Sequence, residues 1–153
     1  MTEPKTAAAM EWSDSFVLGY PAMDHTHQEF VACVAALQRA DDADLPVRLQ
    51  AFADHAMAHF QQEERWMTET DFPAAQCHAD EHAAVLKSVR EVQALLAERG
   101  DVGVVRQLVQ ALVDWFPGHA DYLDASLSHW MAKRSYGGAP VVLRRGVASP
   151  ASN

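Results

Sequence analysis

The strongest constraint on the fold of this chain is a set of four long runs in which apolar residues recur every three or four positions. The runs cover about residues 23–40, 45–70, 71–99 and 102–134. Proline and glycine fall at their ends: Pro46 and Pro73 lie in the first turns of the second and third runs, and Gly100 follows the third. No segment has the alternating pattern of a strand. The sequence therefore predicts an all-α protein, an antiparallel up-down-up-down four-helix bundle.

The core-facing stripe of each run contains histidine where an apolar side chain is expected. On the fourth run, the three-four spacing selects Leu108, Leu112, Trp115, His119 and Tyr122. Burying a polar group without a partner costs roughly 2–7 kcal/mol. A single buried histidine is usually a hydrogen-bonded core residue, but a whole layer of them requires something to coordinate it. The polar members of the four stripes are His27, His59, Glu63, His78, His82 and His119.

The spacing of these residues suits metal binding. His59 and Glu63 are four residues apart, as are His78 and His82, so each pair lies about 40° apart on one helix face. Such a pair can chelate one metal ion or bridge two neighbouring ions. Imidazole suits zinc, copper and iron, and a bridging carboxylate allows two cations to lie close together.

Asp124 is a further candidate ligand, with a less regular spacing. It follows His119 by five residues, which is about 140° around an ideal helix. The two side chains can converge only if the metal lies between their directions or if the helix is locally distorted. Pro117 lies just before them, removes one backbone donor and favours such a distortion.

Length, net charge and cysteine content limit the number of domains, the partners and the cellular compartment that we expect for this chain. A chain of 153 residues is expected to form one domain with a sizeable core. The net charge of −9, without a Lys/Arg cluster, argues against nucleic-acid partners and anionic membrane surfaces. No run is long and uncharged enough for membrane insertion, and the N-terminus has no signal-peptide core. Cys33 and Cys77 form no CxxC pair, so we expect a cytoplasmic protein with reduced thiols.

The order of the polar residues resembles the ligand signature of the hemerythrin family, and of its bacteriohemerythrin-like branch in particular. A single HxxxE motif would carry little weight, but the full order on four expected helices is specific. The resemblance spans about residues 11–133. The order is His27; His59-x-x-x-Glu63; His78-x-x-x-His82; His119-x-x-x-x-Asp124. The flanking residues that agree are Trp12, Met23, Asp24, Phe60, Glu64, Met67, Phe72, Pro73 and Trp115.

The resemblance implies a non-haem diiron centre, bridged by an oxo or hydroxo group, that binds dioxygen reversibly. We therefore expect an oxygen carrier, storage or delivery protein and not an enzyme. We expect a monomer whose partners are dioxygen and an oxygen-consuming enzyme. The implied ligands are His78, His82 and His119 for one iron, His27 and His59 for the other iron with its open coordination position, and Glu63 and Asp124 as bridges.

Two residues beside the site depart from the family's pattern. Phe116 and Ala120 stand where the pattern favours leucine and isoleucine. If both face the open iron, the larger ring and the smaller methyl change the shape of the pocket and its access to water. Oxygen affinity and autoxidation rate depend on these features.

Three histidines and one aspartate lie near the signature but outside it. His25 and His129 are expected at the surface. His55 lies one turn before His59, so a supporting contact with that ligand is one possibility. Asp24 is expected to cap the first helix, and orienting a ligand imidazole is the alternative.

Two other functions remain open at this level. One is a diiron enzyme of peroxidase or oxidase type; ferritin-like enzyme sites use Glu-x-x-His motifs, and no glutamate here has a histidine three residues on. The other is an oxygen or redox sensor module, which a chain without a fused signalling domain disfavours.

We expect residues 11–134 to form the bundle domain with its N-terminal arm, and residues 135–153 to form a flexible tail rich in Gly, Pro and Ser.

Overall fold

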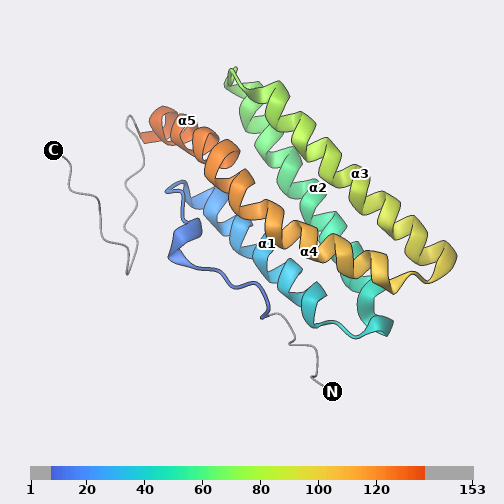
Figure 1. Cartoon of the computed structure of the whole chain (residues 1–153). Coiled ribbons are helices and arrows are strands. Elements are labelled where there is room, and N and C mark those ends of the chain that lie inside the picture. Colours follow the sequence, from blue (N-terminus) through green and yellow to red (C-terminus); the bar gives the residue numbers. More distant parts are fainter. Residues whose placement is uncertain (1–7, 137–153) are drawn as a thin grey trace.

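The computed structural model describes residues 8–136, an N-terminal arm followed by helices joined by short turns. Figure 1 shows the first four long helices packed side by side, each antiparallel to the next, with the fifth continuing the fourth. The described residues contain no strand, and the predicted antiparallel four-helix bundle is confirmed. The long helices are α1 (Pro21–Arg39), α2 (Leu45–Glu69), α3 (Ala75–Arg99), α4 (Val102–His119) and α5 (Ala125–Tyr136). The short elements are the 3-10 turns η1 (Asp14–Phe16) and η2 (Asp42–Asp44) and the π-helical turn η3 (Ala120–Asp124).

The helix ends follow from local sequence. Pro46 lies in the first turn of α2, where its missing N–H would have no helical partner anyway. Gly100 ends α3 with φ of 61°, a left-handed conformation in which its N–H donates to the carbonyl of Leu96. Asp101 then caps α4, because its carboxylate accepts the N–H of Val104 at 3.0 Å. The α3–α4 connection is therefore tight and holds the two helices antiparallel.

Two apolar clusters fill the bundle, and the polar layer lies between them along the helices. The larger cluster includes Phe30, Phe52 and Phe116, all completely buried. The smaller one includes Met67 and Leu127. Burial of these side chains is the main force that holds the helices together.

The apolar stripe changes its phase at η3. Tyr122 is 79% exposed, so its predicted place in the core-facing stripe is wrong. A π-helical turn contains more residues than an α-helical turn, and the extra residue rotates the helix face that follows. Asp124 and Leu127 therefore face inward in place of Tyr122.

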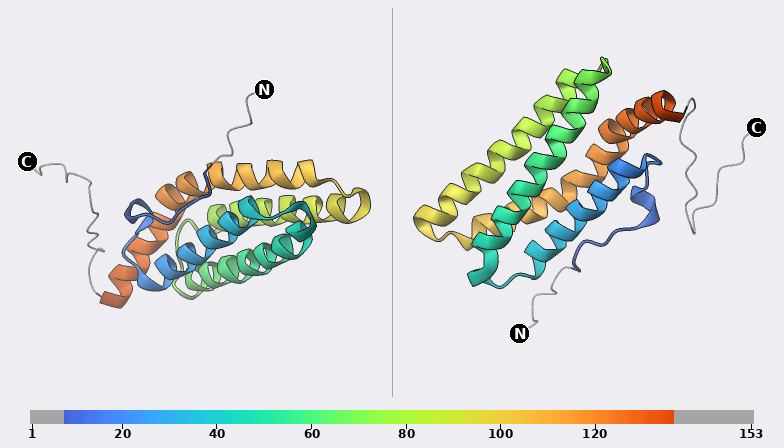
Figure 2. Two further views of the ribbon diagram at one scale, coloured as in Figure 1. Left: turned by 90° about the horizontal axis from the view of Figure 1, so that it is seen from below. Right: turned by 180° about the vertical axis from the view of Figure 1, so that it is seen from behind.

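An N-terminal arm runs alongside α1 (Figure 2), from Met10, whose N–H donates to Oε1 of Gln38 at 2.6 Å, to the start of that helix. The Asp24 carboxylate accepts the backbone N–H groups of Leu18 at 2.8 Å and Gly19 at 3.0 Å. Asp24 thus ties the arm to α1 and does not make the helix cap that the sequence suggested, since the helix begins at Pro21. Ser128 on α5 adds a hydrogen bond to the carbonyl of Leu18 at 3.1 Å.

Three further expectations concern the surface and the end of the chain. Within residues 8–136, no helix combines the length and apolar character needed to cross a membrane. Cys33 and Cys77 are free thiols. The expected tail begins with residues that still belong to α5, and its remainder, residues 137–153, lies outside the described residues.

Replacing Phe52 with alanine tests the packing of the larger cluster. Phe52 is fully buried, and its ring packs edge-on against Phe30 with centroids 5.4 Å apart. The cavity should lower the free energy of unfolding by about 3–5 kcal/mol. Urea unfolding of the metal-free protein, followed by far-UV circular dichroism, measures this value. Val47→Ala on the same helix is the control, because Val47 is 65% exposed and its loss should cost less than about 0.5 kcal/mol.

Candidate metal centre

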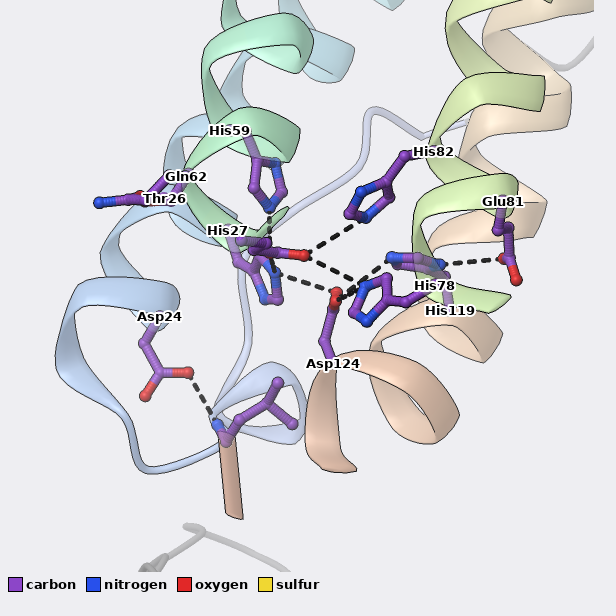
Figure 3. Close-up of polar contacts among 12 residues, drawn as sticks. Asp24, Thr26, His27, His59, Gln62, His78, Glu81, His82, His119 and Asp124 are labelled. Carbon is purple, nitrogen blue, oxygen red and sulfur yellow. Dashed lines mark hydrogen bonds and ion pairs between the residues drawn. The ribbon is translucent and has the colours of Figure 1, made fainter. Parts of the chain in front are cut away.

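Seven polar side chains meet inside the bundle, between its two apolar clusters. Figure 3 shows the histidines of this group and Asp124 pointing toward one another. All seven are buried, and the most exposed of them, His59 and His119, are only 4% exposed. The structure therefore brings together every residue that the spacing singled out. The group consists of His27 on α1, His59 and Glu63 on α2, His78 and His82 on α3, His119 at the end of α4 and Asp124 at the end of η3.

Glu63 directs its two carboxylate oxygens toward different histidines. Oε2 lies 2.6 Å from Nε2 of His59 and 3.5 Å from Nε2 of His27. Oε1 lies 3.2 Å from Nε2 of His78 and 3.3 Å from Nε2 of His82. Glu63 therefore stands between a pair of imidazoles from α1 and α2 and a pair from α3.

Asp124 divides its oxygens in the same way. Oδ2 lies 3.1 Å from Nε2 of His27. Oδ1 lies 2.9 Å from Nε2 of His78 and 3.2 Å from Nε2 of His119. The donor atoms thus form two neighbouring groups that share a carboxylate, and within each group they lie within 4.8 Å of one another. The groups are His27, His59 and Glu63, and Glu63, His78, His82, His119 and Asp124.

The π-helical turn η3 explains how His119 and Asp124 converge. Residues five apart diverge on an ideal α-helix, but the wider turn brings them toward one face. Pro117 lies within α4, and the helix continues through it to His119. The local distortion expected from the sequence is therefore present, and it takes the form of a wide turn directly after His119.

The donor atoms converge without satisfying one another. Within the described residues, Nε2 of His27, His78 and His82 makes no hydrogen bond, and neither does either oxygen of Asp124. Each unsatisfied buried polar atom costs about 1–3 kcal/mol. Imidazole nitrogens and carboxylate oxygens aimed at shared points are the donor set that iron, zinc and copper take. The residues therefore fit a pair of cations.

The electrostatics of the cluster are those of buried ion pairs. Burial acts to lower the pKa of His27, but the nearby carboxylates of Asp124 and Glu63, with oxygens 3.1 Å and 3.5 Å from its Nε2, outweigh burial and raise the pKa to about 10. The same balance raises the pKa of His78 to about 9. Burial acts to raise the pKa of Glu63, yet the neighbouring imidazoles hold it well below its ordinary value. The two carboxylates therefore stay ionised, and positive charge must lie beside them.

A second layer contains one residue that the sequence analysis missed. Oε1 of Glu81 accepts two hydrogen bonds, from Nε1 of Trp115 at 2.8 Å and from Nδ1 of His119 at 2.9 Å. Burial acts to raise the pKa of Glu81, but these two contacts outweigh it and lower the pKa. The contact depends on how α3 is aligned with α4, and no local motif around Glu81 encodes that alignment.

Aromatic rings close the sides of the cluster. Phe60 stacks on His82 with centroids 4.0 Å apart, and Phe116 meets His27 edge-on at 5.3 Å. Phe116 and Ala120 are both completely buried. Of the two departures from the family's pattern, the structure thus places the larger ring directly against His27.

The remaining histidines lie outside the cluster. His25 and His129 are exposed, as expected. The ring of His55 lies 5.7 Å from that of His59, but its Nδ1 faces Glu29 at 3.6 Å and its Nε2 has no partner among the described residues. His55 is therefore a neighbour of His59 that makes no hydrogen bond to it.

Comparison with known proteins agrees with this geometry. Residues 18–127 match the profile of a family described as the hemerythrin HHE cation binding domain. A bacteriohemerythrin from Ralstonia nicotianae is 38% identical over 125 residues, which cover 82% of this chain and 90% of that protein. A myohemerythrin from Riftia pachyptila is 33% identical over 87 residues, which cover 56% of this chain and 69% of that protein. With a matching profile over most of its length and the buried cluster inside that range, this chain belongs to the hemerythrin family.

Proposed function

We propose that this protein binds two iron ions with its seven clustered side chains and binds dioxygen reversibly at the pair, as an oxygen carrier, storage or delivery protein. The observation that carries the proposal is the division of the two carboxylates. Glu63 and Asp124 each direct one oxygen toward His27 and the other toward His78. A carboxylate so placed can bridge two cations and offset their mutual repulsion in a low-dielectric core.

The two metal positions would be unequal in their protein ligands. Three imidazoles, from His78, His82 and His119, serve one position, and two, from His27 and His59, serve the other. With both carboxylates shared, the second position has one protein donor fewer. That position is the place for a small exogenous ligand.

The chain's own residues would keep this position dry. Phe116 lies edge-on to His27, and Phe30 stacks on Phe116 with centroids 4.8 Å apart. Phe30 also lies edge-on to His59 at 6.1 Å. An apolar wall on this side excludes water and protons from the bound gas. The iron pair would supply, one from each ion, the electrons that reversible dioxygen binding requires.

The two relatives, named as a bacteriohemerythrin and a myohemerythrin, support the proposed ligands of this site. We propose a binding protein and not an enzyme, because imidazoles dominate the donor set and leave a single position for a small ligand. We further propose that residues 11–134 form the functional domain.

The metal content of the protein is the first prediction. Five imidazoles and two carboxylates that fall into two groups should bind two iron ions per chain. Elemental analysis of freshly purified protein, and of protein reconstituted with ferrous iron without oxygen, measures this stoichiometry. One zinc ion per chain with no uptake of iron would contradict the assignment.

Reversibility separates a carrier from an enzyme. Reduced protein should gain an oxygenated absorption spectrum on aeration and return to its colourless form on degassing, over at least several cycles. The aromatic wall against His27 is the physical reason, since it slows the entry of water. Complete oxidation to the diferric state at each exposure, with stoichiometric release of peroxide, would instead favour an oxidase or scavenger.

Replacing Glu63 with glutamine tests the bridge. The amide keeps the size of the side chain but loses the charge and one good ligand atom. We expect loss of at least one iron and of oxygen binding, with far-UV helicity largely kept because the apolar clusters remain intact. Iron content and the oxygenated spectrum provide the two measurements.

His25→Ala is the control for this substitution. The His25 side chain is 73% exposed and contacts Glu29 outside the cluster, so iron content and spectrum should not change. Two irons and normal oxygen binding in the Glu63→Gln variant would show that Glu63 does not bridge the ions.

A further inference from the structure

The clustered imidazoles differ in the contacts of their outward ring nitrogen. Nδ1 of His119 lies 2.9 Å from Oε1 of Glu81. The Nδ1 atoms that are buried and have no hydrogen-bond partner among the described residues are those of His27, His59, His78 and His82. The three-histidine position therefore includes one imidazole that is hydrogen-bonded to a carboxylate through its outward nitrogen. The two-histidine position includes no such imidazole.

We propose that Glu81 is a positioning residue that holds His119 in the tautomer and orientation needed to bind a metal ion, and that this contact strengthens the hold on the ion at the three-histidine position. The inference rests on the proposed iron site. It assigns a role to a side chain that does not touch the metal position itself.

The geometry around Glu81 supports this role. Oε1 of Glu81 also accepts the indole N–H of Trp115 at 2.8 Å, so the carboxylate is fixed from two sides. The Trp115 ring stacks on the His119 ring, with centroids 4.2 Å apart and an interplanar angle of 28°. Trp115 and His119 are one turn apart on α4, and Glu81 reaches both from α3. Figure 3 shows its contact with His119. The imidazole is therefore held along one edge by the carboxylate and on one face by the indole.

The hydrogen bond fixes which nitrogen of His119 carries a proton. A neutral imidazole has a single N–H, and donation from Nδ1 to Glu81 leaves the lone pair on Nε2. Nε2 faces the cluster, 3.2 Å from Oδ1 of Asp124. A carboxylate acceptor also makes the imidazole a stronger electron donor, and loss of such an acceptor typically costs about tenfold to hundredfold in metal affinity.

Glu64 provides a matched comparison within the same chain. Its Oε2 atom lies 3.9 Å from Nδ1 of His82, which is too far for a hydrogen bond. The side chains of Glu64 and Glu81 are both 38% exposed. Glu64 thus places the same charge near a neighbouring ligand without the contact that defines the proposed role.

The experiment compares iron-loaded full-length Glu81→Ala and Glu64→Ala proteins with the unmodified chain. Two quantities are measured: the rate of iron release to an excess of a ferrous chelator, and the midpoint potential of the iron pair. The iron at the three-histidine position has more protein ligands and should be the slower of the two to leave. We expect Glu81→Ala to release this iron about tenfold to hundredfold faster. Its potential should become more positive, because a weaker imidazole donor stabilises ferric iron less. Glu64→Ala should leave the release rate nearly unchanged.

Two milder variants distinguish loss of the hydrogen bond from a general loss of folding. Glu81→Gln keeps an acceptor oxygen without the charge, so its release rate should lie between those of the unmodified protein and Glu81→Ala. Trp115→Phe frees one side of the carboxylate and should give a smaller acceleration. Equal release rates and equal potentials for the Glu81 and Glu64 variants would overturn the proposal. The iron content of the unmodified protein, measured beside them, decides separately whether the proposed iron site exists.

Discussion

Two carboxylates buried at the centre of a helical bundle impose the main physical constraint on this protein. Glu63 is 1% exposed and Asp124 is completely buried, yet both have pKa values held below their ordinary range. An ionised carboxylate cannot remain in such a core without nearby positive charge. In the absence of metal, the imidazoles provide it, as the raised pKa values of His27 and His78 indicate. Metal ions that displace these protons would meet the same demand, so binding should release protons and stabilise the fold.

The rest of the architecture serves to place this charged layer. Two apolar clusters flank it, and their burial provides the free energy that holds polar groups in the core between them. The four-residue spacings on α2 and α3 each place two donors on one face. On the last helix, the wide turn η3 performs the same task for His119 and Asp124. A π-helical turn at a functional site is a common way to direct one additional side chain into a core.

The sequence predicted the bundle and the cluster because both follow from periodicity. Apolar spacing defines the helices, and histidine at core-facing positions identifies the buried layer without knowledge of how the helices pack. Tyr122 departs from the regular spacing because the extra residue of η3 rotates the helix face after His119, and apolar periodicity does not encode that turn. The role of Asp24 could not be predicted because its partners, Leu18 and Gly19, belong to an arm with no periodic pattern. Glu81 was missed because its contact with His119 depends on the alignment of two helices.

The measurement that tests the central claim most directly is the position of the metal ions in a crystal of the iron-loaded protein, located by anomalous scattering at the iron absorption edge. We expect two iron peaks no more than about 4 Å apart, as in other paired metal sites. Glu63 and Asp124 should each contact both ions, with three imidazoles on one ion and two on the other. A single peak, or two peaks with no carboxylate shared between them, would contradict this claim.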